Sequence, residues 1–273
     1  MTLSTGAEIP EVLYKYRDLS ERNHDYVRQT IVENKVWFSS RVDFNDPFDC
    51  KVHTHFTGSA RIWERHLREW QEMFRPELNQ QQREAEAAKI LKAEKRHKDP
   101  TVLASAIKEA QQAFNNWGIF CLSASNDDIL MWSYYANGHR GVCLGFAHRP
   151  ARPFGPAFPV VYSSEIPRVN YFTADHEELA RANFLTKALP WRHESEWRVI
   201  DRRRGRGIRQ FPPESLIEVI MGSQMSKEDR KDIMTWIETL SCKPALFEAR
   251  LKKNVYGLEI HLVAPGTAKR GAA

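Results

Sequence analysis

Cysteine is scarce in this sequence, and the positions of the few cysteines exclude two ways of stabilising a small domain. No Cys-x-x-Cys pair and no Cys/His pair at zinc-finger spacing is present, so neither a disulfide framework nor a structural zinc site is indicated. Because isolated cysteines usually behave as small apolar side chains, we expect buried thiols in strands. The 4 cysteines are Cys50, Cys121, Cys143 and Cys242.

Long hydrophobic runs and an export signal are also absent. No window approaches the roughly 18 to 20 continuous apolar residues that a membrane-spanning helix requires. The first residues, MTLSTGAEIPEVLYKYR, lack the charged-then-apolar plan of a signal peptide. We therefore expect a cytoplasmic protein without a membrane partner.

The most familiar catalytic motifs are missing as well. The sequence has no Walker loop, no G-x-G-x-x-G, no G-x-S-x-G and no H-E-x-x-H. These absences remove the usual sequence indications of an NTPase, a dehydrogenase, a serine hydrolase and a zinc peptidase.

What the sequence does contain is enough apolar material for a core. The chain has 273 residues, of which 42% are hydrophobic and 27% charged, so it does not have the composition of a disordered protein. The 40 Lys and Arg residues exceed the 35 Asp and Glu residues by 5. This mild positive charge is compatible with a polyanionic partner but does not require one.

The apolar pattern predicts short strands interleaved irregularly with helices, and no internal repeat is visible. This arrangement favours an α+β fold in one domain, 11–264, over a doubly wound parallel sheet. We expect strands at 13–19, 36–40, 117–123, 141–146, 160–164, 196–200, 216–222, 246–251 and 256–262, and helices at 23–34, 127–138, 176–189 and 226–240.

Residues 59–115 differ from the rest in composition. They are rich in Glu, Lys, Arg, Gln and Ala, and Trp63, Leu67, Trp70 and Phe74 recur at helical spacing. We expect a helical insertion that lies over the core rather than inside it.

Two carboxylates form the densest candidate for chemistry. Glu194 and Glu196 are separated by one residue in an apparent strand, which would direct both side chains to one face, where their mutual repulsion would raise one pKa. The alternative is an exposed pair that alternates with Arg192 and Arg198.

The first expected strand carries a second candidate. Lys15 and Arg17 share one face and Tyr14 and Tyr16 the other, so the cationic face suits a phosphate, which Arg can bind with two hydrogen bonds. An ordinary solvated strand edge explains the pattern equally well.

Ser39 and Ser40 end the next strand, and an acidic turn follows them. Oxygen-bearing side chains crowd this turn and could hold a cation or hydrogen-bond the turn itself; self-capping is the favoured interpretation. They belong to Asp43, Asn45, Asp46 and Asp49.

Three ring-bearing residues could contact a base or a cofactor. Trp132 and Tyr135 lie on one face of an expected helix and could stack on a planar ring, although aromatic residues at this spacing are more often core. His139 lies in a loop position between a helix and a strand.

A basic cluster that contains glycine predicts a loop near 202–206. Such a loop could contact phosphates, or could be a solvated basic turn. The cationic residues are Arg202, Arg203, Arg204 and Arg206.

The strings LYKYR, VWFSSRVDFNDPFDC, FCLSASNDDILMWSYYANGHRGVCLGF and WRHESEWRVI, between about Leu13 and Ile200, resemble a bacterial family catalogued as a domain of unknown function. A weaker resemblance is to ADP-ribosyltransferases, particularly those that modify DNA. In that superfamily a strand with a basic or His residue precedes a helix and a second strand, and a later strand carries a catalytic Glu. LYKYR, the following helix, VWFSS and SEWRVI occur in this order.

This second resemblance implies a split β-sheet with an NAD cleft between its halves. It implies that Glu196 is catalytic, and it requires Glu196 to face the same cleft as Lys15 or Arg17. The usual His of the DNA-modifying branch is replaced by Lys15, and the Tyr or Ser-Thr-Ser element has no clear counterpart. The residues expected to bind NAD are Tyr14, Lys15, Arg17, Ser39, Ser40, Trp132, Tyr135 and His139.

The leading hypothesis is therefore an NAD-dependent ADP-ribosyltransferase that modifies a nucleic acid or a protein, such as a toxin or a phage-defence effector with an antitoxin or defence-system partner. Two alternatives stay open. A non-enzymatic module could bind nucleic acid or a partner through the helical insertion and the basic loop. A metal-dependent nuclease could use Asp46, Asp127, Glu194 and Glu196.

Overall fold

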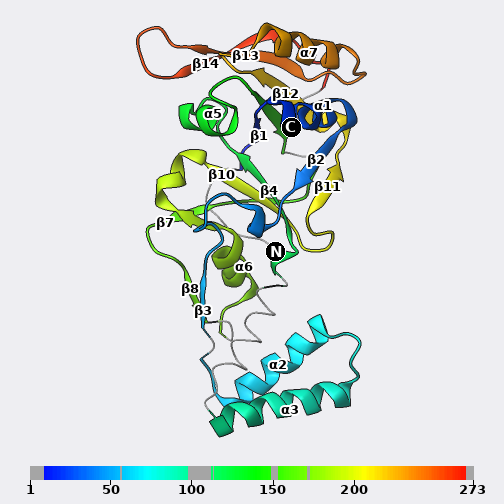
Figure 1. Cartoon of the computed structure of the whole chain (residues 1–273), viewed down its shortest axis with the longest axis vertical. Coiled ribbons are helices and arrows are strands. Elements are labelled where there is room, and N and C mark those ends of the chain that lie inside the picture. Colours follow the sequence, from blue (N-terminus) through cyan, green and yellow to red (C-terminus); the bar gives the residue numbers. More distant parts are fainter. Residues whose placement is uncertain are drawn as a thin grey trace.

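The computed structural model describes residues 9–55, 57–97, 112, 114–148, 153–170 and 173–268, and shows a mixed α+β fold (Figure 1). Its centre is an eight-stranded sheet in the order β14-β13-β12-β5-β1-β4-β10-β6. The strands are β1 (Val12–Arg17), β4 (Gly118–Ser123), β5 (Val142–Ala147), β6 (Ala157–Pro159), β10 (Glu196–Asp201), β12 (Leu216–Met221), β13 (Ala245–Leu251) and β14 (Leu258–Ala264).

Three two-stranded sheets accompany the central sheet. Antiparallel β2 (Lys35–Phe38) and β11 (Gly207–Gln210) form one ribbon, and the parallel pairs are β3 (His53–His55) with β8 (Arg168–Asn170) and β7 (Val161–Ser163) with β9 (Thr186–Ala188). The helices are α1 (Glu21–Glu33), α2 (Ala60–Phe74), α3 (Gln80–His97), α5 (Ile129–Tyr135), α6 (His176–Phe184) and α7 (Lys227–Glu238), with the short 3-10 helices η1 (Arg41–Asp43), η2 (Leu189–Glu194) and η3 (Pro213–Ser215).

The central sheet is continuous but is nearly divided between β1 and β4. β1 pairs with β5, and β4 with β10, at six successive positions each, whereas β1 and β4 pair at one position, Tyr14 opposite Ser123. Five strands, from β14 to β1, therefore lie on one side of this junction, and β4, β10 and β6 lie on the other.

The two faces of the sheet are covered by different elements. On one face Leu13, Leu122, Leu144 and Trp197 pack in a cluster with apolar residues of α1, α7 and the β2–β11 ribbon. On the other face Tyr16 packs with residues of α5. The alternation of side chains along each strand thus decides which residues share a site.

The predicted helical insertion contains α2 and α3, which pack against each other at the end of the molecule opposite the β13–β14 hairpin (Figure 1). The spacing of Trp63, Leu67, Trp70 and Phe74 coincides with α2, although these side chains lie outside those described. Residues 98–111 of the insertion also lie outside the described part of the chain.

One expected helix is wrong in its second half. The segment predicted as helix 176–189 forms α6 only to Phe184, and the chain then becomes β9 and η2. Thr186–Ala188 is extended because it pairs in parallel with β7, so a tertiary contact overrides the helical pattern.

The cysteines also depart in part from expectation. Cys121 and Cys143 lie in strands, but Cys50 lies in a turn with φ 55°, and all 4 thiols are free. Cys50 and Cys143 are buried, whereas Cys121 and Cys242 are partly exposed.

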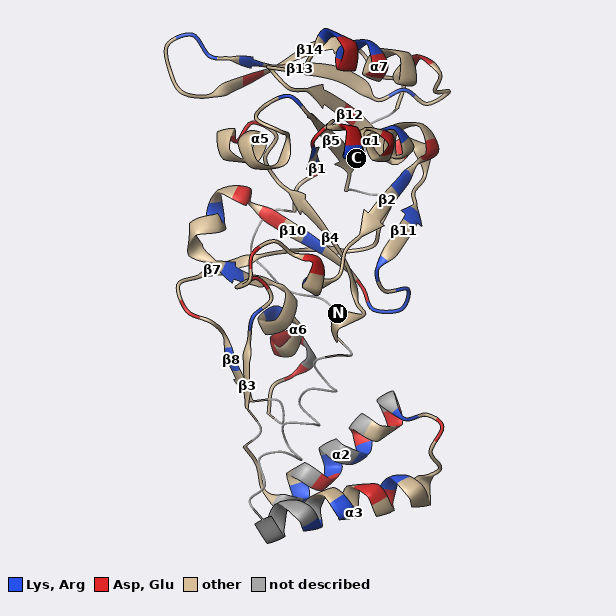
Figure 2. Ribbon diagram, in the orientation of Figure 1, with Lys and Arg blue, Asp and Glu red and all other residues tan. Residues whose placement is uncertain are grey.

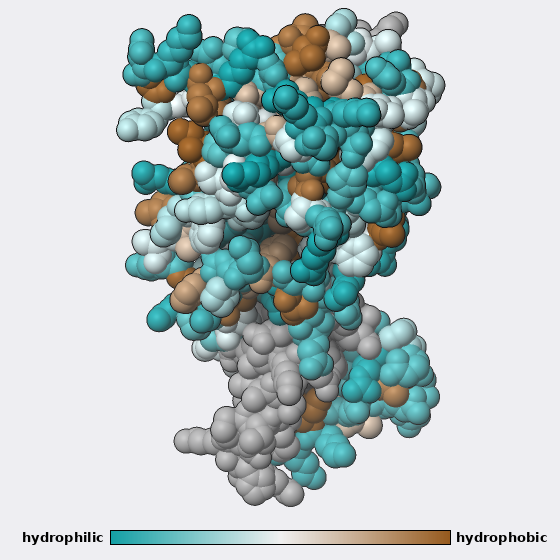
Figure 3. Space-filling view, turned by 45° about the horizontal axis from the view of Figure 1, so that its top comes forward, coloured by the Kyte–Doolittle hydropathy of each residue, from teal (hydrophilic) through white to brown (hydrophobic). Residues whose placement is uncertain are grey.

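No helix in the described ranges is both long and apolar enough to cross a membrane. On the face shown in Figure 3, hydrophobic residues are scattered among hydrophilic ones.

Candidate functional site

A cluster of buried charged side chains lies beside β10, on the sheet face that also carries α5. We call it the carboxylate network. Its members come from four parts of the chain: Asp49 from the acidic turn, Lys187 from β9, Glu194 from η2, and Glu196 and Arg198 from β10. Their side chains are between 0% and 8% exposed, so each charge must be compensated inside the protein.

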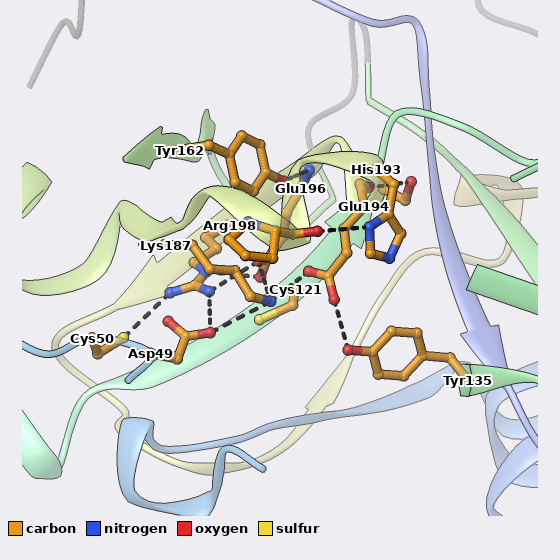
Figure 4. Close-up of polar contacts among 12 residues, drawn as sticks. Asp49, Cys50, Cys121, Tyr135, Tyr162, Lys187, His193, Glu194, Glu196 and Arg198 are labelled. Atoms are coloured by element: carbon orange, nitrogen blue, oxygen red, sulfur yellow. Dashed lines mark hydrogen bonds and ion pairs between the residues drawn. The ribbon is translucent and has the colours of Figure 1, made fainter. Parts of the chain in front are cut away.

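Lys187 lies at the centre of the network (Figure 4). Its Nζ donates to Glu194 and, at 3.1 Å, to Glu196, and lies 3.5 Å from an oxygen of Asp49. One ammonium therefore contacts three carboxylates, which would otherwise repel one another at short range.

Arg198 holds the inner carboxylates in fixed orientations. Its Nε and Nη2 donate to the two oxygens of Glu196 at 2.7 and 2.9 Å, and Nη2 also donates to Asp49 at 2.7 Å. Nη1 donates to the carbonyl of Phe184 at 2.9 Å and to the sulfur of Cys50 at 3.2 Å. This forked arrangement is the geometry in which Arg binds a carboxylate most strongly.

Glu194 forms the side of the network next to α5. Tyr135 Oη donates to Glu194 Oε1 at 2.7 Å, and Ser123 Oγ donates to the Glu194 carbonyl at 2.7 Å. The expectation that Glu194 lies in the strand of Glu196 is wrong, because Glu194 ends η2 and the intervening Ser195 is left-handed, with φ 44°. The two carboxylates nevertheless meet, because this turn brings Glu194 back to Lys187.

The two glutamates have opposite pKa shifts. Burial raises the pKa of Glu194; the nearby charge of Lys187 opposes this rise and the charge of Glu196 adds to it, and the net direction is upward. Burial also acts to raise the pKa of Glu196, but the charge and hydrogen bonds of Arg198, together with Lys187, hold it well below its usual range. The network thus holds three carboxylates, of Asp49, Glu194 and Glu196, and two cationic side chains, of Lys187 and Arg198.

Residues 131–199 match the family model described as "Protein of unknown function (DUF2971)". This finding fits the resemblance to an uncharacterised family. No curated protein and no solved structure matches the chain, and the similarity to ADP-ribosyltransferases is not confirmed. The DUF2971 segment contains four of the five network residues, and Asp49 reaches them from outside it.

The first strand does not join the network as the cleft hypothesis requires. Tyr14, Ser123 and Glu196 lie in one row across β1, β4 and β10, so Lys15 and Arg17 leave β1 on the opposite face. Arg17 stacks 5.4 Å from the ring centroid of Tyr26 in α1. The expectation that Glu196 shares a cleft with Lys15 or Arg17 is therefore wrong, whereas Tyr14 does lie on the face of Glu196.

Lys15 instead fills the junction between the two halves of the sheet. Its Nζ donates to the carbonyl of Cys121 at 2.7 Å and lies 5.3 Å from the ring centroid of Phe120. Burial, with Arg17, lowers the pKa of Lys15 to about 8, against the opposing charges of Cys121, Glu196 and Glu194. The ammonium is thus electrostatically coupled to the network without contacting it.

Ser39 and Ser40 have structural roles. Ser39 forms a backbone bridge with Ile119. Ser40 is fully buried, accepts from Val42 N at 3.4 Å and donates to the carbonyl of Asn115, so it caps η1. The Ser40 hydroxyl is therefore engaged in capping η1, and the contact of Ser39 with Ile119 is made by its backbone.

The acidic turn largely caps itself, as expected. Asp43 accepts from the backbone of Ser40 at 2.8 Å and Asp46 from the backbone of Phe48 at 2.9 Å. Asp49 differs, because its side chain belongs to the carboxylate network.

The four carboxylates that the nuclease hypothesis assigns to a metal lie in three different places. Asp127 accepts from Ser125 at 2.8 Å in its own turn, Asp46 caps a different turn, and both glutamates contact Lys187. Within the described ranges, no group of three or more His, Cys, Asp and Glu residues could hold a metal ion.

The three ring-bearing candidates have different surroundings. Trp132 is fully buried and donates from Nε1 to Asn126 at 2.9 Å, so the expectation that it stacks on a cofactor is wrong. His139 stacks on Trp132, with 6.3 Å between centroids. Tyr135 contacts Glu194, and its neighbour Tyr134 is 62% exposed.

The four arginines of the basic cluster are exposed in the turn between β10 and β11. Arg204 pairs with Asp201 at 2.8 Å, and Arg206 lies 3.5 Å from Asp43. The turn is about six residues from Glu196 along the chain, so it marks the far end of the same strand, roughly 20 Å away.

Sequence reasoning missed Lys187, the cation that unites the network. The residue lies at the end of a segment with a helical pattern, and no motif marks it. One signal was available in the sequence. If two glutamates share a buried face, their two negative charges require a second cation besides one Arg.

Proposed function

We propose that the protein is an NAD-dependent ADP-ribosyltransferase whose reacting groups are the carboxylates of Glu194 and Glu196. The observation that carries this proposal is the pair of buried carboxylates, Glu194 and Glu196, that share the ammonium of Lys187. The pKa values of the two carboxyl groups are shifted in opposite directions. Adjacent carboxyl groups that differ in this way are typical of acid–base sites. The near-division of the sheet at Tyr14 and Ser123 also supports a split-sheet architecture. The proposal departs from the resemblance at β1, because Tyr14, and not Lys15 or Arg17, lies on the face of Glu196.

The proposed reaction breaks the bond between the nicotinamide nitrogen and the ribose. The bonding electrons leave with nicotinamide, positive charge develops on the ribose, and a nucleophile of the acceptor forms the new bond to the same carbon. The ionised Glu196 stabilises the developing positive charge, as carboxylates do in glycoside chemistry. Ionised Glu194, whose raised pKa makes it the stronger base, takes the proton that the acceptor nucleophile loses.

The hydrogen bond from Tyr135 covers Glu194. In this proposal, NAD reaches the carboxylates when Tyr135 turns away, so α5 and η2 form the entrance. Lys187 and Arg198 act as positioning residues, because both are occupied with carboxylates. A toxin or phage-defence role, with an antitoxin or defence-system partner, belongs to the same proposal because depletion of NAD would harm a cell.

The decisive experiment measures nicotinamide release from NAD by the purified full chain, with pooled cellular nucleic acid and protein as acceptors. We expect Glu194→Gln and Glu196→Gln each to reduce release by on the order of 10²-fold. Glu214→Gln, an exposed carboxylate in η3, is the matched control and should leave the rate unchanged. Circular dichroism and thermal unfolding establish that each variant is folded.

Two outcomes would overturn the proposal. One is the absence of nicotinamide release and of NAD binding in a folded sample that is offered both acceptors. The other is release that persists unchanged in both glutamine variants. In either case the carboxylate network would be a structural device that joins β9, η2 and β10.

A further inference from the structure

We propose that the turn between β10 and β11, with the β2–β11 ribbon beside it, is a binding surface for single-stranded nucleic acid. The surface consists of Trp37, Trp117, Arg202, Arg203, Arg204 and Arg206, and we call it the arginine–tryptophan surface. This inference goes beyond the proposed function, because binding requires neither NAD nor the carboxylate network.

Charge is the first argument. Residues 201–209 contain five arginines and one aspartate, a formal charge of +5 − 1 = +4 within nine residues, nearly the whole excess of the chain. Asp201 is engaged by Arg204 at 2.8 Å and Arg209 at 3.1 Å. Within the part of the chain that the structure describes, Arg202 and Arg203 form no ion pair with a carboxylate, so their charges face solvent. Figure 2 shows the blue turn and the blue segments of β2 and β11 beside it.

The second argument is the stacking of arginine on tryptophan. The guanidinium of Arg202 lies 5.4 Å from the ring centroid of Trp117, and that of Arg206 lies 5.9 Å from the ring centroid of Trp37. Trp117 is itself stacked on Phe184, with 4.8 Å between centroids and 12° between planes. Layers of planar groups are the surfaces on which unpaired bases stack, and arginine adds hydrogen bonds to phosphate.

The third argument is that the turn is already ordered in the free protein. Asp201 accepts from the backbone of Arg203 and Arg204 at 3.1 and 3.0 Å. Gly205, with φ +66°, packs so tightly that a Cβ on Gly118 would lie 2.0 Å from its carbonyl oxygen. A surface that is fixed before binding loses little conformational entropy when a ligand arrives.

These features favour a single strand over a duplex or an acidic protein. In a duplex the faces of the bases are stacked on one another, and an acidic peptide carries charge without planar bases. A single strand offers both phosphates for the arginines and free base faces for stacking. We therefore expect phosphates to contact the arginines and bases to stack beside Trp37 and Trp117.

Fluorescence anisotropy with a short labelled oligodeoxythymidylate tests the inference on the full chain, without NAD. We expect binding, and we expect the logarithm of the association constant to fall linearly with the logarithm of the salt concentration. Arg202→Ala with Arg206→Ala should reduce this slope by about 1.4, because each phosphate contact on a single strand contributes about 0.7. Lys252→Ala with Lys253→Ala removes the same charge from the exposed tip of the β13–β14 hairpin and should leave binding nearly unchanged.

Two further variants separate stacking from charge. Arg202→Lys with Arg206→Lys keeps the charge but loses the planar group, and Trp37→Ala removes one ring. We expect each to weaken binding by about tenfold, with the salt slope of the lysine variant preserved.

The inference would be overturned by equal binding of duplex DNA or polyglutamate, by equal losses in the hairpin control, or by an absence of binding at low salt. Oligonucleotide binding is measured without NAD and nicotinamide release is measured without the oligonucleotide, so failure of this inference is distinguishable from failure of the proposed reaction.

Discussion

Lys187 is the residue on which the carboxylate network depends. Its side chain is 8% exposed and contacts Asp49, Glu194 and Glu196, so its removal leaves buried carboxylates with Arg198 as their remaining cationic partner in the network. We expect Lys187→Met to lower the free energy of unfolding by about 3–5 kcal/mol, the usual effect of breaking a buried ion pair. Urea unfolding measures it, with exposed Lys227→Met as the matched control.

The double variant makes this prediction specific to the network. Lys187→Met combined with Glu194→Gln removes one cation and one carboxylate together, so its free energy of unfolding should exceed that of Lys187→Met alone. A double-mutant cycle measures the coupling. A change within about 0.5 kcal/mol for Lys187→Met, as for an ordinary surface substitution, would contradict the prediction.

At the level of elements, the sequence predicts strands and helices better than their spatial partners. The β10 strand and the self-capped turn at Asp43 and Asp46 follow from local patterns, because apolar runs and Asx turns are local. The αL turn at Ser195 and the β7–β9 pairing depend on contacts between distant segments, and no local pattern contains them. Glu194 and Glu196 do meet, which is one of the two alternatives that the sequence left open, but they meet through a turn and not through the alternation of one strand.

The same limit explains the error about the first strand. Alternation correctly places Lys15 and Arg17 on one face of β1. Which face carries Glu196 depends on the register across β1, β4 and β10, where Tyr14 lies in the row of Glu196. Register is a tertiary property, so the sequence left both possibilities open.

The contact between β4 and the basic turn gives a prediction at this scale. A Cβ on Gly118 would lie 2.0 Å from the carbonyl oxygen of Gly205, so Gly118→Ala must displace the turn or the start of β4. We expect a loss of about 2–4 kcal/mol in the free energy of unfolding, as for an overpacked buried site. Chemical denaturation measures this loss.

Gly155→Ala is the informative comparison for Gly118→Ala. Gly155 has φ +93° and no atom within 4 Å of an added Cβ. Gly155→Ala therefore measures the cost of backbone strain alone, because the added Cβ meets no other atom. Its expected cost is about 1–2 kcal/mol. A Gly118→Ala variant no less stable than wild type would show that the turn yields freely, and would also weaken the argument that the arginine–tryptophan surface is preformed.

At the scale of the whole molecule, five strands and three strands meet at one residue pair, and Lys15 lies in that junction. Its Nζ donates a hydrogen bond to the carbonyl of Cys121 in β4. Cys121 lies two residues from the Tyr14–Ser123 pair, where β1 and β4 no longer pair. The junction is thus held by a polar contact within an otherwise apolar layer that includes Phe120. Because a titratable group lies at the junction, we expect the free energy of unfolding to depend on pH.

The sign of that dependence follows from the pKa. Burial, with Arg17, lowers the pKa of Lys15 from 10.5 to about 8 in the folded protein. Between these values the unfolded chain binds the proton and the folded chain does not, so the contribution of Lys15 to stability rises as the pH rises through this window. Below about pH 8 both states are charged, and the full cost of burying the ammonium is present.

Lys15→Met removes the buried charge while keeping a side chain of similar length. We expect it to increase the free energy of unfolding by about 1–2 kcal/mol near pH 7, after loss of the hydrogen bond to Cys121 is included. This advantage should shrink as the pH rises from about 8 to about 10.5, because wild type then discards its proton on folding. Urea unfolding of wild type, Lys15→Met and Lys227→Met across this range measures the difference. A difference between Lys15→Met and wild type that stays constant with pH would show that the Lys15 ammonium remains solvated in the folded state, and the junction would then be held by the Tyr14–Ser123 pairing and the surrounding apolar contacts alone.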